Sequence, residues 1–405
     1  MLTKIVCFAV VAVAATHAQG VYPQGSGFPL EVYSLQPDSD IPAVAASGWN
    51  IGHRYGWNEV SDSSAGAASL NALMAAFGQN GMEGLPHLPA YHDTTAGVWT
   101  EWAQAEMANW IQAISPNTNI AYWDLPEEQR YWKPSEFQIV QDYSTWTRVY
   151  DAQQRPNYMY IPTHYTQDQV SNYVPYLDVV PASAYADFAG QPHAWVRWRM
   201  EETIRGIQLA SAAVGPDYLN GQKTPVGVVQ VFVGPNGNIP SADQTYHDFW
   251  QLIASGAQGV FVFSYFHRND HNGVLLPNWN ALQQAASEIT GSELGSVVLH
   301  GDPFSGVTAS VLSGPSQTVS FIPVGYATPV QFPSIHLLAK QWNGNTYIIA
   351  VNSTDQAVTG NISNLPATSA DSASVMFESR TISISGGGFI DSFPAWGVHI
   401  YSIGP

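Results

Sequence analysis

The chain has 405 residues, of which 11% are charged and 12% aromatic, and its 31 acidic and 13 basic side chains give a formal net charge of −18 at pH 7. Nucleic-acid-binding proteins present stripes of lysine and arginine, so this acidic composition predicts no nucleic-acid partner. The length suits a barrel of about 250 residues followed by a module of about 100 residues.

The first 18 residues are typical of a secretory signal peptide. Lys4 precedes the apolar run Ile5 to Ala15, and Thr16-His17-Ala18 supplies the small residues that signal cleavage favours. The run is too short to span a bilayer, and no later stretch is long enough to do so. Cys7, the single cysteine, lies inside this segment, so a mature chain would contain no disulfide. We therefore expect a secreted, extracellular protein with no membrane partner.

Residues 19–296 alternate short apolar segments with amphipathic ones, a pattern that indicates βαβ units. The expected strands are Phe28–Leu35, Trp49–His53, Gly84–Ala90, Ile120–Trp123, Asn157–Ile161, Val179–Ser183, Val226–Phe232 and Val260–Tyr265. The expected helices are Ala65–Phe77, Ala96–Ile114, Ser135–Gln153, Trp195–Val214, Ala242–Ala254 and Trp279–Ile289. Eight such repeats predict an α/β fold, a closed (β/α)8 TIM barrel with its site at the C-terminal ends of the strands.

Residues 297–405 have the texture of a small all-β sandwich, in which short alternating segments are separated by Gly, Asn, Ser and Pro turns. The expected strands include Thr308–Leu312, Thr318–Ile322, His336–Trp342, Thr346–Asn352 and Val398–Ile403. Two Asn-x-Ser/Thr triplets in this module predict N-glycans at Asn352 and Asn361 if the source is eukaryotic.

Carboxylates, imidazoles and aromatic rings follow several of the expected strands. The candidate catalytic carboxylates are Glu128, Asp187, Glu127 and Asp124. The candidate sugar-binding residues are His53, Tyr55, Trp57, Tyr91, His92, Trp123, His164, Tyr185, Gln230, Tyr265 and His267. Hydrolysis of a glycosidic bond needs a protonated carboxylic acid beside the leaving oxygen and a second carboxylate as nucleophile or base. These residues, gathered at the C-terminal ends of the expected strands, therefore predict a carbohydrate substrate.

Strand 4 supplies the main candidate for the acid. Glu128 lies beside Glu127 and Asp124, so repulsion and partial burial would raise the pKa of one carboxyl group toward that of an acid catalyst. The alternative is structural, because Glu127 and Glu128 follow Pro126 and would suit the first turn of a helix.

Four segments resemble the barrel strands of clan-A-like glycoside hydrolases: Phe28–Leu35, Trp123–Glu128, Pro225–Phe232 and Gly256–Tyr265. The resemblance covers most of the barrel, and the C-terminal module is similar to the β-domain that often follows such barrels. In that clan the acid/base is a Glu at the end of strand 4, within an Asn-Glu-Pro or Asp-Glu-Pro motif. The resemblance therefore implies Glu128 as the acid/base, with Glu127-Glu128-Gln129 in the place of the motif.

The chain departs from this clan at strand 7, where the resemblance implies a nucleophilic Glu. Gln230 stands near that position, and the next carboxylate along the chain is Asp243. Either the second carboxylate comes from elsewhere, with Asp187 the leading choice and Asp124 or Glu59 behind it, or the site only binds. Asp187 also has a structural alternative as a helix or turn cap.

Histidine spacing gives no support for a metal site. His267, Asp270 and His271 cluster after strand 8 and His92-Asp93 follows strand 3, but neither has the His-Glu-x-x-His spacing of a zinc helix. Gln36-Pro37-Asp38 stands where a phosphate-binding loop would follow strand 1. We therefore expect no metal and no cofactor.

Two functions are compatible with these patterns. The preferred one is a glycoside hydrolase acting on a neutral or weakly charged poly- or oligosaccharide, with Glu128 as acid/base and Asp187 as its provisional partner. The alternative is a non-catalytic carbohydrate-binding or extracellular-matrix protein. The amide at Gln230 favours the second function, and the carboxylates elsewhere on the rim favour the first.

Overall fold

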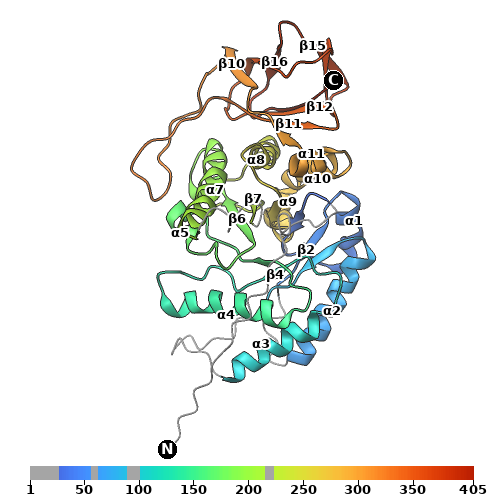
Figure 1. Cartoon of the computed structure of the whole chain (residues 1–405), viewed down its shortest axis with the longest axis vertical. Coiled ribbons are helices and arrows are strands. Elements are labelled where there is room, and N and C mark those ends of the chain that lie inside the picture. Colours follow the sequence, from blue (N-terminus) through green and yellow to red (C-terminus); the bar gives the residue numbers. More distant parts are fainter. Residues whose placement is uncertain (1–26, 56–62, 89–100, 215–222) are drawn as a thin grey trace, which may run out of the picture.

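The computed structural model describes residues 27–55, 63–88, 101–214 and 223–405. The predicted signal peptide, residues 1–18, lies outside the described residues. The described chain forms a barrel surrounded by helices and, beyond one side of it, a β-rich C-terminal module (Figure 1). None of the helices in these ranges has both the length and the apolar character needed to cross a bilayer.

Eight short parallel strands form the barrel. They are β1 (Leu30–Val32), β2 (Ile51–His53), β3 (Glu83–Leu85), β4 (Trp123–Asp124), β5 (Asn157–Tyr158), β6 (Val179–Ala184), β7 (Thr224–Gln230) and β8 (Val260–Phe263). Their order in the sheet is β3-β2-β1-β8-β7-β6-β5-β4. Parallel bridges from Gly84 to Ile120 and from His87 to Asp124 close the sheet on itself. The predicted (β/α)8 barrel is therefore confirmed, and each of the eight predicted strands overlaps an observed strand.

The helices around the barrel are α1 (Ile41–Ala46), α2 (Ser63–Gln79), α3 (Glu101–Ile114), α4 (Pro134–Tyr150), α5 (Gln167–Ser171), α6 (Ala186–Ala189), α7 (Ala194–Val214), α8 (Ala242–Ala254), α9 (Asp270–Gly273), α10 (Leu276–Thr290) and α11 (Leu294–His300). A capping box formed by Ser241 and Gln244 begins α8, whose inner face is buried. The six predicted helices are present as α2, α3, α4, α7, α8 and α10. Those not predicted have four to seven residues, too few to show a helical period.

The C-terminal module contains β9 (Asp302–Pro303), β10 (Thr308–Ser313), β11 (Ile335–Trp342), β12 (Asn345–Asn352), β13 (Val358–Ser363), β14 (Ser372–Val375), β15 (Arg380–Ser383), β16 (Phe389–Phe393) and β17 (Val398–Ile403). They form two antiparallel sheets, β10-β13-β16 and β15-β14-β17-β12-β11-β9. Ile362 and Phe389 of the first sheet share one core with Ile348 and Tyr401 of the second. This shared core confirms the predicted all-β sandwich.

One predicted strand in this module was wrong. The segment Thr318–Ile322 forms no strand, and Phe321 makes only an isolated bridge to Val330. Prolines at 323, 329 and 333 lack the N–H groups that a continuous ladder would need. Phe321 instead packs into the core cluster of the barrel, so this long connection follows the barrel surface.

The module is fixed to the barrel through α8. Tyr347, Ile349 and Val351 of β12 belong to the same buried cluster as the barrel helices. In addition, Ser353 Oγ donates to Gln251 Oε1 of α8 at 2.6 Å. The predicted domain boundary between residues 296 and 297 falls inside α11, and it stays a prediction.

The two predicted glycan sites differ in exposure. Asn352 is 0% exposed, and its Nδ2 atom donates to the carbonyl oxygens of Gln356 and Pro394 at 2.8 and 2.7 Å. The prediction at Asn352 is therefore wrong for the folded protein, because the nitrogen that would carry the glycan is enclosed. Asn361 lies in β13 and is partly exposed.

Candidate active site

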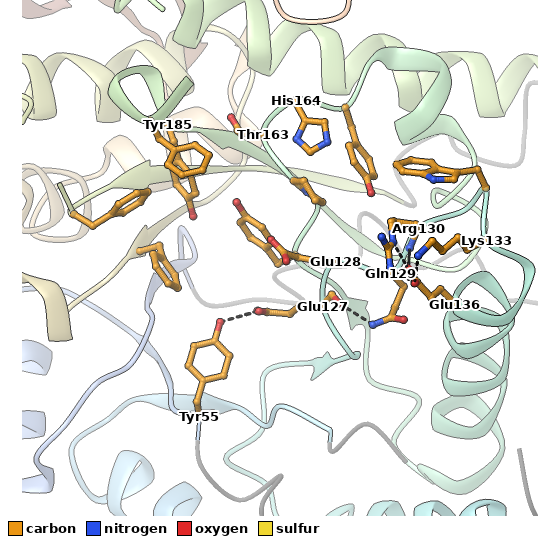
Figure 2. Close-up of a pocket in the computed structure, with 17 residues that line it drawn as sticks. Tyr55, Glu127, Glu128, Gln129, Arg130, Lys133, Glu136, Thr163, His164 and Tyr185 are labelled. Carbon is orange, nitrogen blue, oxygen red and sulfur yellow. Dashed lines mark hydrogen bonds and ion pairs between the residues drawn. The ribbon is translucent and has the colours of Figure 1, made fainter. Parts of the chain in front are cut away.

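A cavity of about 1080 Å³ opens where the barrel strands end (Figure 2). Its lining comes from β8 and from the segments that follow β2, β4, β5, β6 and β7, which is where TIM barrels carry their sites. The lining residues are Tyr55, Glu127, Glu128, Gln129, Arg130, Trp132, Lys133, Glu136, Tyr160, Pro162, Thr163, His164, Tyr165, Tyr185, Phe188, Phe232 and Phe263.

Glu127 is the carboxyl group most strongly affected by its surroundings in this cavity. The Tyr55 hydroxyl lies 2.9 Å from both of its carboxylate oxygens. Figure 2 shows the Tyr55 side chain pointing toward Glu127. Burial and the nearby charge of Asp124 raise the pKa of Glu127 to about 8, although His87 and the Tyr55 hydrogen bond oppose the rise. Glu127 is thus mostly protonated at neutral pH, as a general acid must be.

Glu128 reaches the same cavity from an unusual backbone conformation. Its φ is +58°, in the left-handed region that non-glycine residues rarely adopt. Its backbone N–H donates to the Tyr160 carbonyl oxygen at 3.3 Å, which ties the turn to the segment after β5. Successive side chains of an extended segment point to opposite sides. With Glu128 in this left-handed conformation, the consecutive residues Glu127 and Glu128 both line the same cavity.

Beneath Glu127 lies a buried group that we call the cavity cluster, formed by His53, His87 and Asp124. Asp124 Oδ2 lies 2.5 Å from His87 Nδ1 and 3.3 Å from His53 Nε2. Burial opposes ionisation of Asp124, but the charge and hydrogen bonds of His87 and the hydrogen bond of His53 outweigh it and lower the pKa of Asp124. Burial also lowers the pKa of His53. For His87 burial is opposed by the charge and hydrogen bond of Asp124 and by the charge of Glu127, which together raise the pKa. The cluster therefore holds an ionised carboxylate close to Glu127.

The ligand-type atoms of the cavity cluster and Glu127 lie within 4.8 Å of one another, a spacing that invites comparison with a metal site. Two ligands on one tetrahedral zinc ion, each about 2.0–2.1 Å from the metal, are separated by roughly 3.3 Å. His87 Nδ1 and Asp124 Oδ2 are 2.5 Å apart, closer than two ligands of one zinc ion, and share a hydrogen bond. We interpret the cavity cluster as a hydrogen-bonded group that controls the charge around Glu127.

The rim of the cavity has a charged edge and an aromatic wall. At the charged edge, Arg130 Nε donates to Glu136 Oε2 at 2.6 Å, and Lys133 Nζ lies 3.4 Å from Glu136 Oε1. The Arg130 guanidinium holds the pKa of Glu136 at about 2, so this carboxylate is ionised and unsuited to proton donation. Trp132, 48% exposed, stands beside these charges.

The aromatic wall consists of Tyr160, Tyr185, Phe188, Phe232 and Phe263. The Tyr185 ring stacks on Tyr160 with centroids 6.1 Å apart and meets Phe232 edge-on at 5.1 Å. On the neighbouring loop, burial lowers the pKa of His164, which leaves its imidazole neutral and able to donate and accept hydrogen bonds. The wall and His164 suit a ligand with apolar faces and hydroxyl edges.

Several residues predicted from the sequence do line this cavity: Glu127, Glu128, Tyr55, His164 and Tyr185. His53 and Asp124 lie below them in the cavity cluster. The candidates Trp57, Tyr91, His92 and Glu59 lie outside the described residues.

Asp187 does not line the cavity. It belongs to α6, and its Oδ2 atom lies 3.5 Å from His193 Nε2. Gln230, at the end of β7, is buried: its Oε1 accepts from the Phe188 N–H at 3.1 Å, and its Nε2 donates to the Phe232 carbonyl oxygen at 2.9 Å. The predicted substrate contact at Gln230 therefore needs correction, because its amide holds the aromatic wall instead.

Two predicted aromatic contacts also need correction. Trp123 is fully buried, and its indole nitrogen donates to Asp151 Oδ2 at 2.9 Å. Tyr265 donates to Asp40 Oδ2 at 2.7 Å, and its ring lies 3.3 Å from the Arg268 guanidinium carbon. Both side chains are engaged in the protein and do not line the cavity.

His267 lies next to the cavity instead of in its lining. Its Nδ1 atom is 2.5 Å from Asp270 Oδ2, and its ring centroid is 5.8 Å from that of Phe263. The imidazole thus supports the outer side of the aromatic wall.

Sequence reasoning missed His87 and most of the aromatic wall. His87, Tyr160, Phe232 and Phe263 all lie at or just after strand ends, so the rule that located Tyr55 would also have located them. Trp132, Arg130, Lys133 and Glu136 follow in the segment after β4 and the start of α4, where no strand-end signal points to a site.

No protein-family model matches the chain, and no curated protein matches it in sequence. Solved structures do match its fold. They include an α-amylase from Geobacillus thermoleovorans complexed with acarbose, with TM-score 0.55, 8% identity and coverage of 91% of each chain. A GH30 endoxylanase from Clostridium papyrosolvens has TM-score 0.52 and 12% identity, over 97% of this chain and 98% of its own. A glycoside hydrolase of family 5 from Bacteroides vulgatus has TM-score 0.57 and 11% identity, over 93% of this chain and 89% of its own. The chain thus shares its overall fold, over more than 90% of its length, with glycoside hydrolases of several families.

Proposed function

We propose that the protein is a secreted glycoside hydrolase in which Glu127 is the general acid and Glu128 supplies the second carboxylate. The observation that carries this proposal is the environment of Glu127, a carboxyl group that keeps its proton near pH 7 in an open cavity. The sequence favoured Glu128 as the acid. The burial and the contacts of Glu127 support exchanging the two roles.

The reaction needs two carboxyl groups with different protonation states. Glu127 would transfer its proton to the glycosidic oxygen as the bond from that oxygen to the anomeric carbon breaks. Glu128 would act on the anomeric carbon, directly or through a water molecule whose proton it accepts. Tyr55, hydrogen-bonded to both oxygens of Glu127, would hold the acid in place.

The cavity supports a neutral or weakly charged poly- or oligosaccharide as the substrate. The aromatic wall offers surfaces for the apolar faces of sugar rings, and the cations at the charged edge are already paired with Glu136. Export would follow from the predicted signal peptide, and Asn361 remains the candidate site for an N-glycan.

A non-catalytic carbohydrate-binding or matrix protein is the second candidate. One observation favours it: β7 ends in Gln230, whose amide is bonded to backbone groups, where the resemblance implies a nucleophilic carboxylate. In this case the cavity would hold a glycan without cleaving it.

A polysaccharide digestion screen with Glu127→Gln, Glu128→Gln and the control Glu136→Gln tests the proposal. We expect the first variant to lose about 10²- to 10⁴-fold in turnover, the range for removal of a general acid. The control removes a carboxylate from the same cavity and should retain most activity. Undiminished turnover in Glu127→Gln would contradict the role of Glu127 as the general acid. Glycan binding without turnover in the wild type would favour the second candidate.

A further inference from the structure

A second hollow, of about 210 Å³, lies where the barrel meets the C-terminal module. We call it the junction subsite and define it by Trp396, His193, Gln244, Gln317, Asp355 and Gln356, which all line it. His193 and Gln244 belong to the barrel, and the other four residues belong to the module, Gln317 lying in its long connection between β10 and β11. Both parts of the protein therefore build this subsite.

The junction subsite lies close to the cavity described above. Phe188 of α6 is 45% exposed and lines the cavity as part of the aromatic wall. Its neighbour Asp187 has a carboxylate oxygen 3.5 Å from Nε2 of His193, which lines the junction subsite. The short helix α6 thus lies between the two hollows, and an extended ligand leaving the cavity over Phe188 would meet the second hollow next.

Trp396 is a partly exposed ring held in a fixed position. It meets His193 and His247 edge-on, with centroid distances of 5.4 and 5.2 Å. Asp248 links these two imidazoles: its oxygens lie 2.9 and 3.0 Å from His193 Nδ1, and Oδ1 lies 2.9 Å from His247 Nδ1. We call His193, His247 and Asp248 the junction cluster. Because this buried cluster supports the ring, Trp396 offers a platform that needs little ordering when a ligand binds.

The side chains around Trp396 suit hydroxyl-rich ligands. Gln317, Asp355 and Gln356 are exposed around the hollow, so they bring amide donors, amide acceptors and a carboxylate to its edge. No lysine or arginine lines the hollow among the described residues. A rigid aromatic face with an edge of amides is suited to a neutral sugar ring and poorly suited to a phosphate group.

We propose that the junction subsite binds a distant sugar unit of the same glycan chain whose other units occupy the cavity. This inference rests on the proposed function, because it takes the ligand of the cavity to be a saccharide. The subsite adds affinity for long chains by making the second contact intramolecular. A short oligosaccharide fills the cavity without reaching Trp396.

Affinity electrophoresis in polysaccharide gels tests the inference, with Glu127→Gln as the background so that little substrate is consumed. Adding Trp396→Ala should weaken retention by the polysaccharide roughly tenfold, the effect of losing one aromatic anchor. Affinity for a di- or trisaccharide, measured by calorimetry, should change less than twofold. The control Trp342→Ala removes a tryptophan from β11 of the same module and should leave both values unchanged.

Since Trp396 packs against the junction cluster, Trp396→Ala could weaken binding by disturbing the fold. A second variant tests the subsite without altering this packing. Gln317→Ala combined with Gln356→Ala removes two exposed side chains and should weaken polysaccharide retention about threefold. Unchanged retention in both variants, or an equal loss for short and long ligands, overturns the inference. If the wild type binds the polysaccharide through Trp396 but never cleaves it, the subsite stands and the proposed hydrolysis fails.

Discussion

The cavity cluster and the junction cluster have the same composition, two histidines around one buried aspartate, but they lie in different surroundings. The cavity cluster lies below Glu127, a carboxyl group that opens into a large cavity. The junction cluster is enclosed between α7, α8 and the C-terminal module, where His247 Nε2 approaches Ser353 Oγ at 3.3 Å. A His-Asp-His group therefore indicates no particular function by itself. Its neighbours decide whether it controls an acid or supports an interface.

Replacing the aspartate of each cluster by asparagine should give different results. The largest effect is expected from Asp248→Asn in the junction cluster, on the stability of the protein. Asp248→Asn leaves the His193 and His247 imidazoles without their shared carboxylate, and breaking such a buried pair costs about 3 kcal/mol. We expect thermal and urea unfolding to show this loss, while the pH profile of turnover stays in place. If Asp248→Asn shifts the pH profile of turnover and leaves stability unchanged, the junction cluster acts in catalysis and our assignment of a structural role to it is wrong.

The stability effect of Asp248→Asn should depend on pH. Burial of His193 is opposed by the charge and hydrogen bond of Asp248 and by the charge of Asp187, which together raise its pKa. This contribution is therefore complete below the unfolded value of about 6.5 and fades as pH rises through the raised pKa. The pKa of Asp248 is lowered, so its own contribution is present above about pH 4 and is lost in acid. Urea unfolding at several pH values should show the largest difference from wild type near pH 5–6.

In the cavity cluster, we expect Asp124→Asn to change the pH dependence of catalysis. The charge of Asp124 raises the pKa of Glu127 more than His87 lowers it, so removing it should lower that pKa from about 8. Glu127 would then lose its proton at a lower pH. We expect the alkaline limb of the kcat/KM profile to move to lower pH and turnover at pH 8 to fall about tenfold, the effect of one pKa unit. If the alkaline limb does not move, Asp124 does not control the pKa of the catalytic acid.

Tyr55→Phe should produce the smallest effect, with the opposite sign. The Tyr55 hydroxyl donates to Glu127 and thereby favours its ionised form, so its loss should raise the pKa of the acid. The alkaline limb should move to higher pH, and kcat/KM on its plateau should fall a few-fold because the carboxyl group is less well held. The same pH series as for Asp124→Asn measures this shift. A shift of both variants in one direction would contradict this account of Glu127.

Local sequence patterns were sufficient for the barrel and for much of its rim. Segments such as Val226–Phe232 and Ala242–Ala254 carry their periodicity and turn signals within about ten residues, so their structure follows from nearby residues. The strand-end rule then placed Tyr55, Glu127, Glu128 and Tyr185 at one rim. Thr318–Ile322 looked like a strand by the same criteria, but the prolines at 323, 329 and 333 that follow it and the contact of Phe321 with the barrel decided otherwise.

The sequence by itself determined the (β/α)8 repeat, the β-rich C-terminal module and the rim on which a site would lie. Only the tertiary structure decided which glutamate keeps a proton, because the pKa of Glu127 depends on burial, on Asp124 of β4 and on Tyr55 and His87 from the segments after β2 and β3. It also decided that Asp187 pairs with His193 and that Gln230 bonds to backbone groups. The contacts of Glu127 with Tyr55 and of Gln230 with Phe188 join residues 72 and 42 positions apart, which meet only when the barrel closes.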